Sequence, residues 1–192
     1  MKKLVLLITI LFVSVLSTAC INNFAVQELN NKAKVYLNNG DTDTAICRLK
    51  SSLDLDSNMY ETHYNLAVAY IAAKKYDEAI DSLHTVLKLK PDFVDAYYSL
   101  GVANEEKAED LINGTSEVKS DGSVAPSSHK NLSVVDKQKI CDYISEAIEN
   151  YNQYLSRKSD SPDKSKVNDR INYLNGEQKK YNVQDSASTQ AE

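Results

Sequence analysis

Residues 60–93 read YETHYNLAVAYIAAKKYDEAIDSLHTVLKLKPDF, and the fold follows from the pattern in this stretch. Its first half places His63, Leu66, Ala67 and Tyr70 at the spacing of one helical face. A second apolar face comes after a pair of lysines and is made of Ala79, Ile80, Leu83, Val86 and Leu87. Pro91 then ends the second helix, because proline cannot continue a helix. The stretch therefore predicts two helices joined by a short turn.

The same pattern recurs at equal spacing before and after this stretch, without a gap. The earlier copy supplies Ala33, Tyr36, Ala45, Leu49, Leu53 and Leu55 at equivalent positions. The later copy supplies Tyr97, Leu100 and Gly101. Small residues at positions 33, 67 and 101 let two helix backbones approach closely, so we expect helices to cross there. Three copies in register favour a repeat over an ordinary helical bundle with accidental spacing.

These copies resemble the tetratricopeptide repeat, a 34-residue pair of antiparallel helices. The resemblance implies an all-α solenoid of about three helix hairpins, with repeats at 24–58, 59–93 and 94–161. The terminal copies depart from the pattern: Ser57 stands where a proline is usual, Lys32 stands where Leu66 does, and Asn104 replaces a tyrosine. Terminal repeats are often atypical.

The third repeat is interrupted. Its second-helix pattern, Ala147-Ile148 and Tyr151, appears late, and residues 114–132 between the two helices are rich in Ser, Gly and Asp. We expect two helices each extended by about two turns, with Leu111 and Ile112 packing near Val135 and Ile140, and a loop at 114–132.

The C-terminal part begins at Pro162. Residues 162–181 predict a capping helix, with Val167, Ile171 and Leu174 on one face. Residues 182–192 are polar and are predicted to be a disordered tail.

The N-terminus reads as an export signal. Lys2-Lys3 precedes an apolar run from Leu4 to Leu16, which is shorter than the roughly 20 residues that a membrane-spanning helix needs. Ser17-Thr18-Ala19-Cys20 then resembles a bacterial lipoprotein signal, which implies cleavage after residue 19 and lipidation of Cys20. Ser17 also departs from the aliphatic residue usual at its position, and Ser17 with Ala19 fits an ordinary signal peptidase. The alternative is therefore a soluble periplasmic or secreted protein.

Lipidation implies a location in the bacterial envelope. Ile21, rather than aspartate, after the cysteine favours the periplasmic side of the outer membrane over the inner membrane. Residues 20–23 leave only a short linker, so we hypothesise that the first repeat lies against the membrane surface.

The resemblance also implies a concave groove lined by the first helix of each repeat. The repeat register places nine principal residues there, namely Asn31, Lys34, Tyr64, Asn65, Val68, Ile71, Tyr98, Val102 and Glu105. The same register also places Asn30 and Leu37 in the groove. Asn31 and Asn65 occupy a position that, in peptide-binding relatives, bonds to the ligand backbone. Relatives that grip a C-terminal carboxylate carry Lys or Arg where this chain has Gln27 and Asp95, so we expect no such clamp. The alternative role for Tyr64 is packing between repeats.

Composition narrows the function class. The net charge is −5 and no basic stripe is present, which argues against nucleic-acid binding. The three histidines are scattered, with no metal-ligand spacing, and we find no nucleophile motif or phosphate loop. We therefore expect no enzyme activity, cofactor or metal. Cys47 and Cys141 are expected to be free structural thiols, because they lie two repeats apart.

The sequence predicts an envelope lipoprotein that binds a protein or peptide and helps to assemble or position another complex. The alternatives are a soluble exported adaptor or chaperone-like subunit, and a structural partner that binds through the extended third hairpin. Neither the partner nor the oligomeric state follows from the sequence.

Overall fold

The computed structural model describes residues 23–114 and 132–182. The expected signal peptide 1–19, Cys20, most of the inserted loop and the tail 183–192 lie outside these residues. The described chain is all helical, which confirms the predicted fold class. None of its helices has the length and apolar character needed to cross a bilayer.

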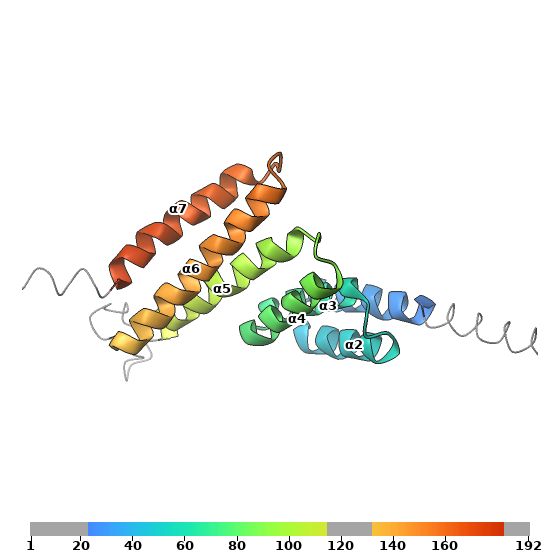
Figure 1. The fold of residues 1–192 in the computed structure, drawn as a ribbon. Coiled ribbons are helices and arrows are strands. Elements are labelled where there is room, and N and C mark those ends of the chain that lie inside the picture. Colours follow the sequence, from blue (N-terminus) through green and yellow to red (C-terminus); the bar gives the residue numbers. More distant parts are fainter. Residues whose placement is uncertain (1–22, 115–131, 183–192) are drawn as a thin grey trace, which may run out of the picture.

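Within these residues, seven helices follow one another in antiparallel hairpins (Figure 1). The first helix covers residues 23–38. The others are α2 (Thr42–Leu55), α3 (Tyr60–Ala72), α4 (Tyr76–Leu89), α5 (Asp95–Gly114), α6 (Val134–Arg157) and α7 (Lys164–Tyr181). The first helix and α2 form repeat one, α3 and α4 form repeat two, and the longer α5 and α6 form repeat three. The first helix and α7 lie at opposite ends of the array (Figure 1).

The turns inside the first two repeats both reverse the chain between two helices, but a different residue type takes the positive φ in each. Gly40 has a positive φ of 78°, and Asp41 then caps α2 by accepting a hydrogen bond from the Thr44 amide. After α3, Lys74 takes the positive φ, at 58°, and the Lys75 amide returns to the Tyr70 carbonyl at 2.8 Å. Both turns bring the next helix back against the previous one.

The small residues do lie at helix crossings. Ala33 and Ala67 on the first helices are fully buried, as are Ala45, Ala79 and Ala147 on the second helices. Gly101 holds the equivalent crossing in repeat three. A Cβ on Gly101 would lie 2.6 Å from the Tyr151 ring, so only glycine fits there with Tyr151 in its present place. Tyr151 thus fills repeat three from α6, whereas Tyr70 fills repeat two from α3.

The third hairpin is extended as predicted. Helix α5 continues to Gly114, and Ser133 caps α6 by accepting from the Asp136 amide at 3.0 Å. Leu111 and Ile112 pack against the core cluster that contains Ile140, but Val135 is 62% exposed, so its predicted place in this contact is wrong. It falls on the outer face of α6, with Val134. The inserted loop begins after Gly114, which is helical, and Leu132 near its other end is buried.

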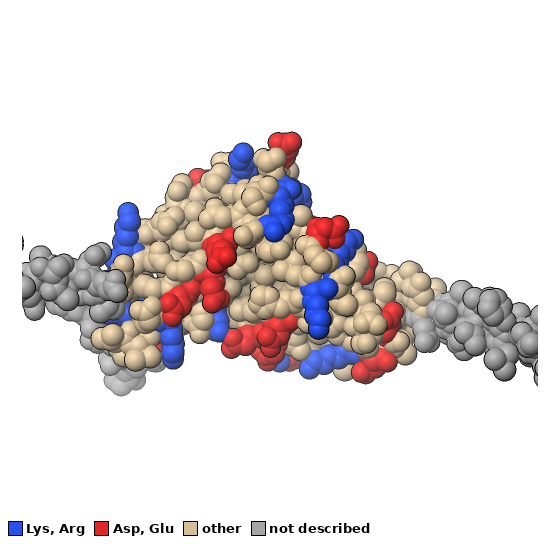
Figure 2. Space-filling view, in the orientation of Figure 1, with Lys and Arg blue, Asp and Glu red and all other residues tan. Residues whose placement is uncertain are grey.

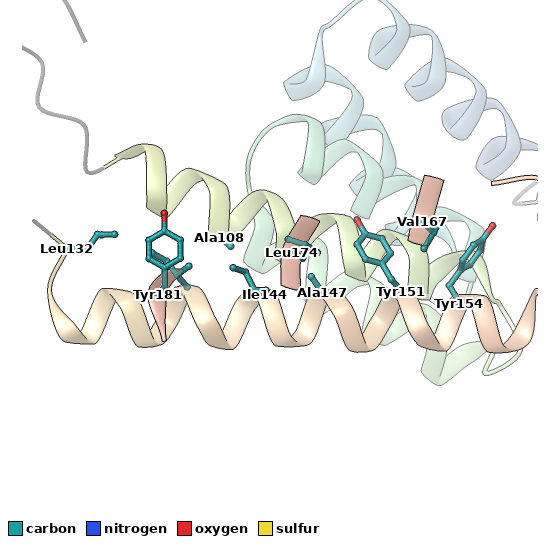
Figure 3. Packing of buried hydrophobic residues seen from close by; sticks show 10 residues of the cluster. Ala108, Leu132, Ile144, Ala147, Tyr151, Tyr154, Val167, Leu174 and Tyr181 are labelled. Atoms are coloured by element: carbon teal, nitrogen blue, oxygen red, sulfur yellow. The ribbon is translucent and has the colours of Figure 1, made fainter. Parts of the chain in front are cut away.

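Helix α7 covers the open end of repeat three. Val167, Leu174 and Tyr181 are buried against α5 and α6, and Ile171 packs beside them (Figure 3). In Figure 3 the buried side chains of α6 form one row from Ile144 to Tyr154. The opposite face of α7 carries polar residues, as expected of a terminal helix.

Candidate functional site

One hollow, of about 310 Å³, lies between the first helix and α3. Asn30 forms its base. The Asn30 amide donates to Ser52 Oγ and Thr62 Oγ1, both at 2.9 Å, and its carbonyl accepts from Asn65 Nδ2 at 2.8 Å. This network fixes both amide groups, and it leaves the Asn65 carbonyl oxygen able to accept another hydrogen bond.

The rim of this hollow is formed by Gln27, Asn31, Lys34, Met59 and Glu61. Asn31 and Lys34 are exposed. In the part of the chain that the structure describes, neither side chain has a hydrogen-bond or ion-pair partner. The hollow therefore offers amide donors and acceptors together with one cation, Lys34, and one carboxylate, Glu61, which suits the backbone of an extended peptide.

A second hollow, of about 500 Å³, lies further along the array; the two share no lining residue, but Asn65 of α3 lines the first and its neighbour Tyr64 lines the second. Its walls come from α3, α5, α6 and α7. Three tyrosines, Tyr64, Tyr98 and Tyr154, line it together with Val167. Tyrosines provide a large contact area at a low ordering cost. We call the two hollows together the groove.

Charged residues surround the second hollow in pairs. Lys158 donates to Asp95 at 3.0 Å, and Lys166 lies 3.5 Å from Asp163. These pairs are exposed, and each contributes little to stability. Because the charges balance, the hollow does not select strongly for either sign. Figure 2 likewise shows acidic and basic residues interspersed on the face in view.

Five of the nine predicted groove residues line the groove: Asn31, Lys34, Tyr64, Asn65 and Tyr98. Tyr64 also packs edge-on against Phe93, with ring centroids 4.9 Å apart, so both roles considered for it hold in the structure. Tyr98 lies between Tyr151 and Tyr154, with centroid distances of 5.7 and 5.4 Å.

The other four predicted residues do not line either hollow. Val68 is 37% exposed beside them. Ile71 and Val102 pack against the hydrophobic clusters of the array, as does Leu37. These three side chains pack between neighbouring helices. Packing positions recur once per repeat, as groove positions do, so the repeat register alone does not distinguish them.

Glu105 is the clearest correction. Its side chain is 5% exposed, and Tyr151 Oη and Arg170 Nε both donate to Glu105 Oε2, at 2.6 and 2.7 Å. Burial and the Glu105 carboxylate raise the pKa of Tyr151, so this hydroxyl stays protonated and remains a donor. Glu105 therefore joins α5, α6 and α7 internally, and it is not available to a ligand.

Reasoning from the sequence missed the contribution of α6 and α7. Tyr154, Lys158, Lys166 and Arg170 reach the second hollow because α7 packs where the first helix of a fourth repeat would lie. The apolar face of residues 162–181 could have predicted this contribution, because that segment can be aligned with the first helix of each repeat, the helix that lines the groove. The pairing of Glu105 with Arg170, 65 residues apart, had no local signal.

The described residues contain no cluster of three or more His, Cys, Asp or Glu that could hold a metal ion. Cys47 is exposed and Cys141 is half-buried, and both are free thiols.

Comparison with known proteins agrees with this geometry. Residues 36–117 match the family model for the tetratricopeptide repeat. The match covers the end of repeat one, all of repeat two and α5. A search of curated protein sequences gave no significant match.

Solved structures share the fold at low sequence identity. The first tetratricopeptide domain of human RPAP3 aligns with a TM-score of 0.57 and 18% identity, over 82% of this chain and 96% of that one. The second RPAP3 domain, solved in complex with an HSP70 peptide, aligns with a TM-score of 0.55 and 12% identity, over 80% and 98%. The TPR2B domain of yeast Sti1, in its complex with pHsp70, aligns with a TM-score of 0.57 and 14% identity, over 81% and 98%. At this identity the likeness shows the fold alone.

Proposed function

We propose that this protein is a lipid-anchored interaction scaffold of the bacterial cell envelope. It holds an extended segment of a partner protein in the groove and so helps to assemble or position another complex. The observation that carries the proposal is the pair of hollows lined by α3, the first with the unpaired amide of Asn31 at its rim and the second with three tyrosines. Peptide complexes of proteins with this fold support the proposal.

The ligand is recognised mainly through its backbone and apolar side chains. Asn31 and the Asn65 carbonyl oxygen bind backbone groups, and Tyr64 and Tyr98 contact side chains. A free C-terminal carboxylate is not required. Gln27 carries no charge, and Asp95 is tied to Lys158 at 3.0 Å.

Anchoring follows from the N-terminal sequence. Cleavage after Ala19 makes Cys20 the first residue, and acyl chains there hold the repeats at the periplasmic face of the outer membrane. The mass of the mature N-terminus tests this step: a mass equal to the unmodified chain from Cys20, or from any later residue, contradicts anchoring but leaves the groove proposal standing.

In-cell photo-crosslinking tests the groove. A crosslinking residue replaces Lys34 or Lys166, at the two ends of the groove, and a matched control replaces His84, which is exposed on α4. We expect one dominant protein product, identified by mass spectrometry, at both groove positions and not at His84. Equal products at all three positions contradict a groove ligand. A product found only from Ser127, in the inserted loop, assigns binding to the extended hairpin instead.

A further inference from the structure

The first helix has an uncovered face on the side away from its core contacts. Phe24 is 70% exposed and Val35 is 58% exposed. They are eleven residues apart, which is about three helical turns, so they lie on one line along the helix. Glu28 and Lys32 lie between them and form an ion pair at 2.7 Å. We call these four residues the end face. A shallow, mostly apolar hollow of about 290 Å³ runs along it.

Three of the four residues of this face have buried equivalents elsewhere in the array. Glu28, Lys32 and Val35 correspond to Thr62, Leu66 and Ala69 in α3, and to Ala96, Leu100 and Ala103 in α5. All six equivalents are buried, with exposures between 0 and 5%, whereas Phe24 corresponds to Asn58 and Asp92, which are exposed before α3 and α5 begin. In α3 and α5 this face packs on the preceding repeat. In the first helix it is left open, with a paired charge at the centre and an apolar side chain at each end.

The length of the preceding chain limits what can cover the end face. Phe24 is four residues after Cys20, so a fully extended chain places its Cα within about 14 Å of the lipid-bearing residue. A lipid surface at Cys20 is therefore within reach of Phe24. Because Glu28 and Lys32 neutralise each other, the face can approach headgroups without an unpaired charge.

We propose that the end face lies on the lipid bilayer, with Phe24 and Val35 in the interfacial region. This inference rests on the anchoring part of the proposed function and extends it to residue-level contacts. Aromatic and aliphatic side chains on one side of a helix bind the boundary between headgroups and acyl chains. The bilayer thus covers the side of the first helix that, in α3 and α5, packs on the preceding repeat.

This placement sets the direction of the groove. Lys34 is ten residues from Phe24, so it lies about 80° around the helix from it. With the end face on the bilayer, the first hollow opens at the membrane surface, because Gln27 and Asn31 line both that hollow and the one along the end face. A partner anchored in the same membrane reaches the groove by lateral diffusion.

Tryptophan fluorescence tests the proposal, because the chain has no native tryptophan. Phe24→Trp and Val35→Trp provide two reporters on the end face. Tyr173→Trp is the matched control, since Tyr173 is 52% exposed on α7 at the far end of the array (Figure 1). Each full-length variant is expressed in bacteria, purified from membranes and reconstituted into phosphatidylethanolamine–phosphatidylglycerol vesicles. Quenching is measured with brominated lipid and with aqueous iodide.

We expect both end-face reporters to be quenched by brominated lipid and to be several-fold less sensitive to iodide than the reporter at 173. Iodide quenching of Trp at 35 equal to that at 173 overturns the proposal, even if position 24 is protected by the nearby anchor. Protection from iodide without quenching by brominated lipid also overturns it, because a second protein then covers the face. Failure of the wild-type chain to float with vesicles is a different result, since it contradicts the anchor itself.

Discussion

At the scale of single residues, the contact between Gly101 and Tyr151 tests the packing of repeat three. Gly101→Ala places a Cβ 2.6 Å from an aromatic ring. Tyr151 is fully buried and cannot move cheaply, so we expect a loss of about 1–3 kcal/mol in the free energy of unfolding. Urea denaturation measures it. Gly176→Ala is the control: a Cβ there meets nothing within 4 Å. It should stabilise α7 by about 0.5–1 kcal/mol through helix propensity. Equal effects at both glycines would contradict the packing argument.

Glu105 and Glu109 provide a second residue-scale comparison with opposite signs. Glu105→Gln removes the charge that Arg170 and Tyr151 contact, so we expect a loss of about 1–3 kcal/mol near pH 7. Glu109 differs, because burial and the carboxylates of Glu105 and Glu106 raise its pKa. Its charged form is disfavoured in the folded state.

Glu109→Gln should therefore leave stability unchanged or raise it slightly at pH 7. Protonated Glu109 favours folding at low pH, and this contribution is lost as the pH rises through the raised pKa. Urea denaturation of both variants between pH 4 and pH 8 checks the signs. A larger loss from Glu109→Gln than from Glu105→Gln would mean that the buried network is not the main contact between these helices.

The two thiols give a residue-scale prediction that needs no mutation. Cys47 is exposed, whereas Cys141 is half-buried and burial raises its pKa. Because the thiolate is the reactive form, iodoacetamide should modify Cys47 several-fold faster than Cys141 at pH 7.5. Peptide mapping after timed quenching measures both rates. If Cys47 and Cys141 react at equal rates in the native protein, and unfolding in urea does not change either rate, the described position of α6 against α7 is contradicted.

At the scale of secondary-structure elements, α7 is held by few but fully buried side chains. Leu174 is 2% exposed and its neighbour Tyr173 is 52% exposed. Leu174→Ala should lower the free energy of unfolding by about 2–5 kcal/mol, as large-to-small changes in cores do. Tyr173→Ala should change it by less than about 0.5 kcal/mol. Thermal unfolding followed by circular dichroism distinguishes them, and a similar loss from both would show that α7 does not dock as described.

Elements were the part of the fold that sequence reasoning predicted best. The seven described helices follow from apolar periodicity and turn residues. Side-chain roles on each helix were harder to assign. Residues that line the groove and residues that pack between helices both recur once per repeat. The register therefore could not show that Tyr98 lines the groove whereas Val102 packs in the core. The prediction for Glu105 was wrong for another reason. A carboxylate on a helix is usually solvated, but Glu105 is buried by partners on α6 and α7, which are distant in the sequence.

At the scale of the whole molecule, the array has two unequal halves. Helices α5 and α6 share the largest interface, and α7 covers it, whereas the first helix has an open end face. Repeat arrays are stabilised mainly by contacts between neighbours. Hydrogen exchange should therefore be slowest in the middle of α5 and α6 and fastest in the first helix, in the absence of lipid. Mass spectrometry of peptic peptides measures this order, and uniform protection across the chain would contradict it.

The sequence could not indicate this asymmetry in advance, because it depends on contacts between distant segments. Arg170 pairs with Glu105 across 65 residues of chain. Tyr151 meets Gly101 from the far side of the inserted loop. Gly101 and Tyr151 are both positions of the repeat pattern, but the pattern does not show that they touch, and the pairing of Glu105 with Arg170 is no part of it. The repeat explains how the array is built, and these pairs explain why its C-terminal half is a single unit.

The Gly101–Tyr151 contact also limits how this protein can be recombined. Repeats one and two follow the same register without a gap, so an extra copy of repeat two could be inserted between them in register, although the new interface between the two copies would have Tyr64 and Val86 where Asn30 and Ser52 bond to Thr62. Repeat three is different: its aromatic filler comes from the second helix, and its glycine is matched to that one ring. A consensus repeat in its place would bring a second tyrosine to the same space and leave Arg170 of α7 without a carboxylate. Lengthening the array is therefore possible at its N-terminal side, whereas the last three helices can only be exchanged together.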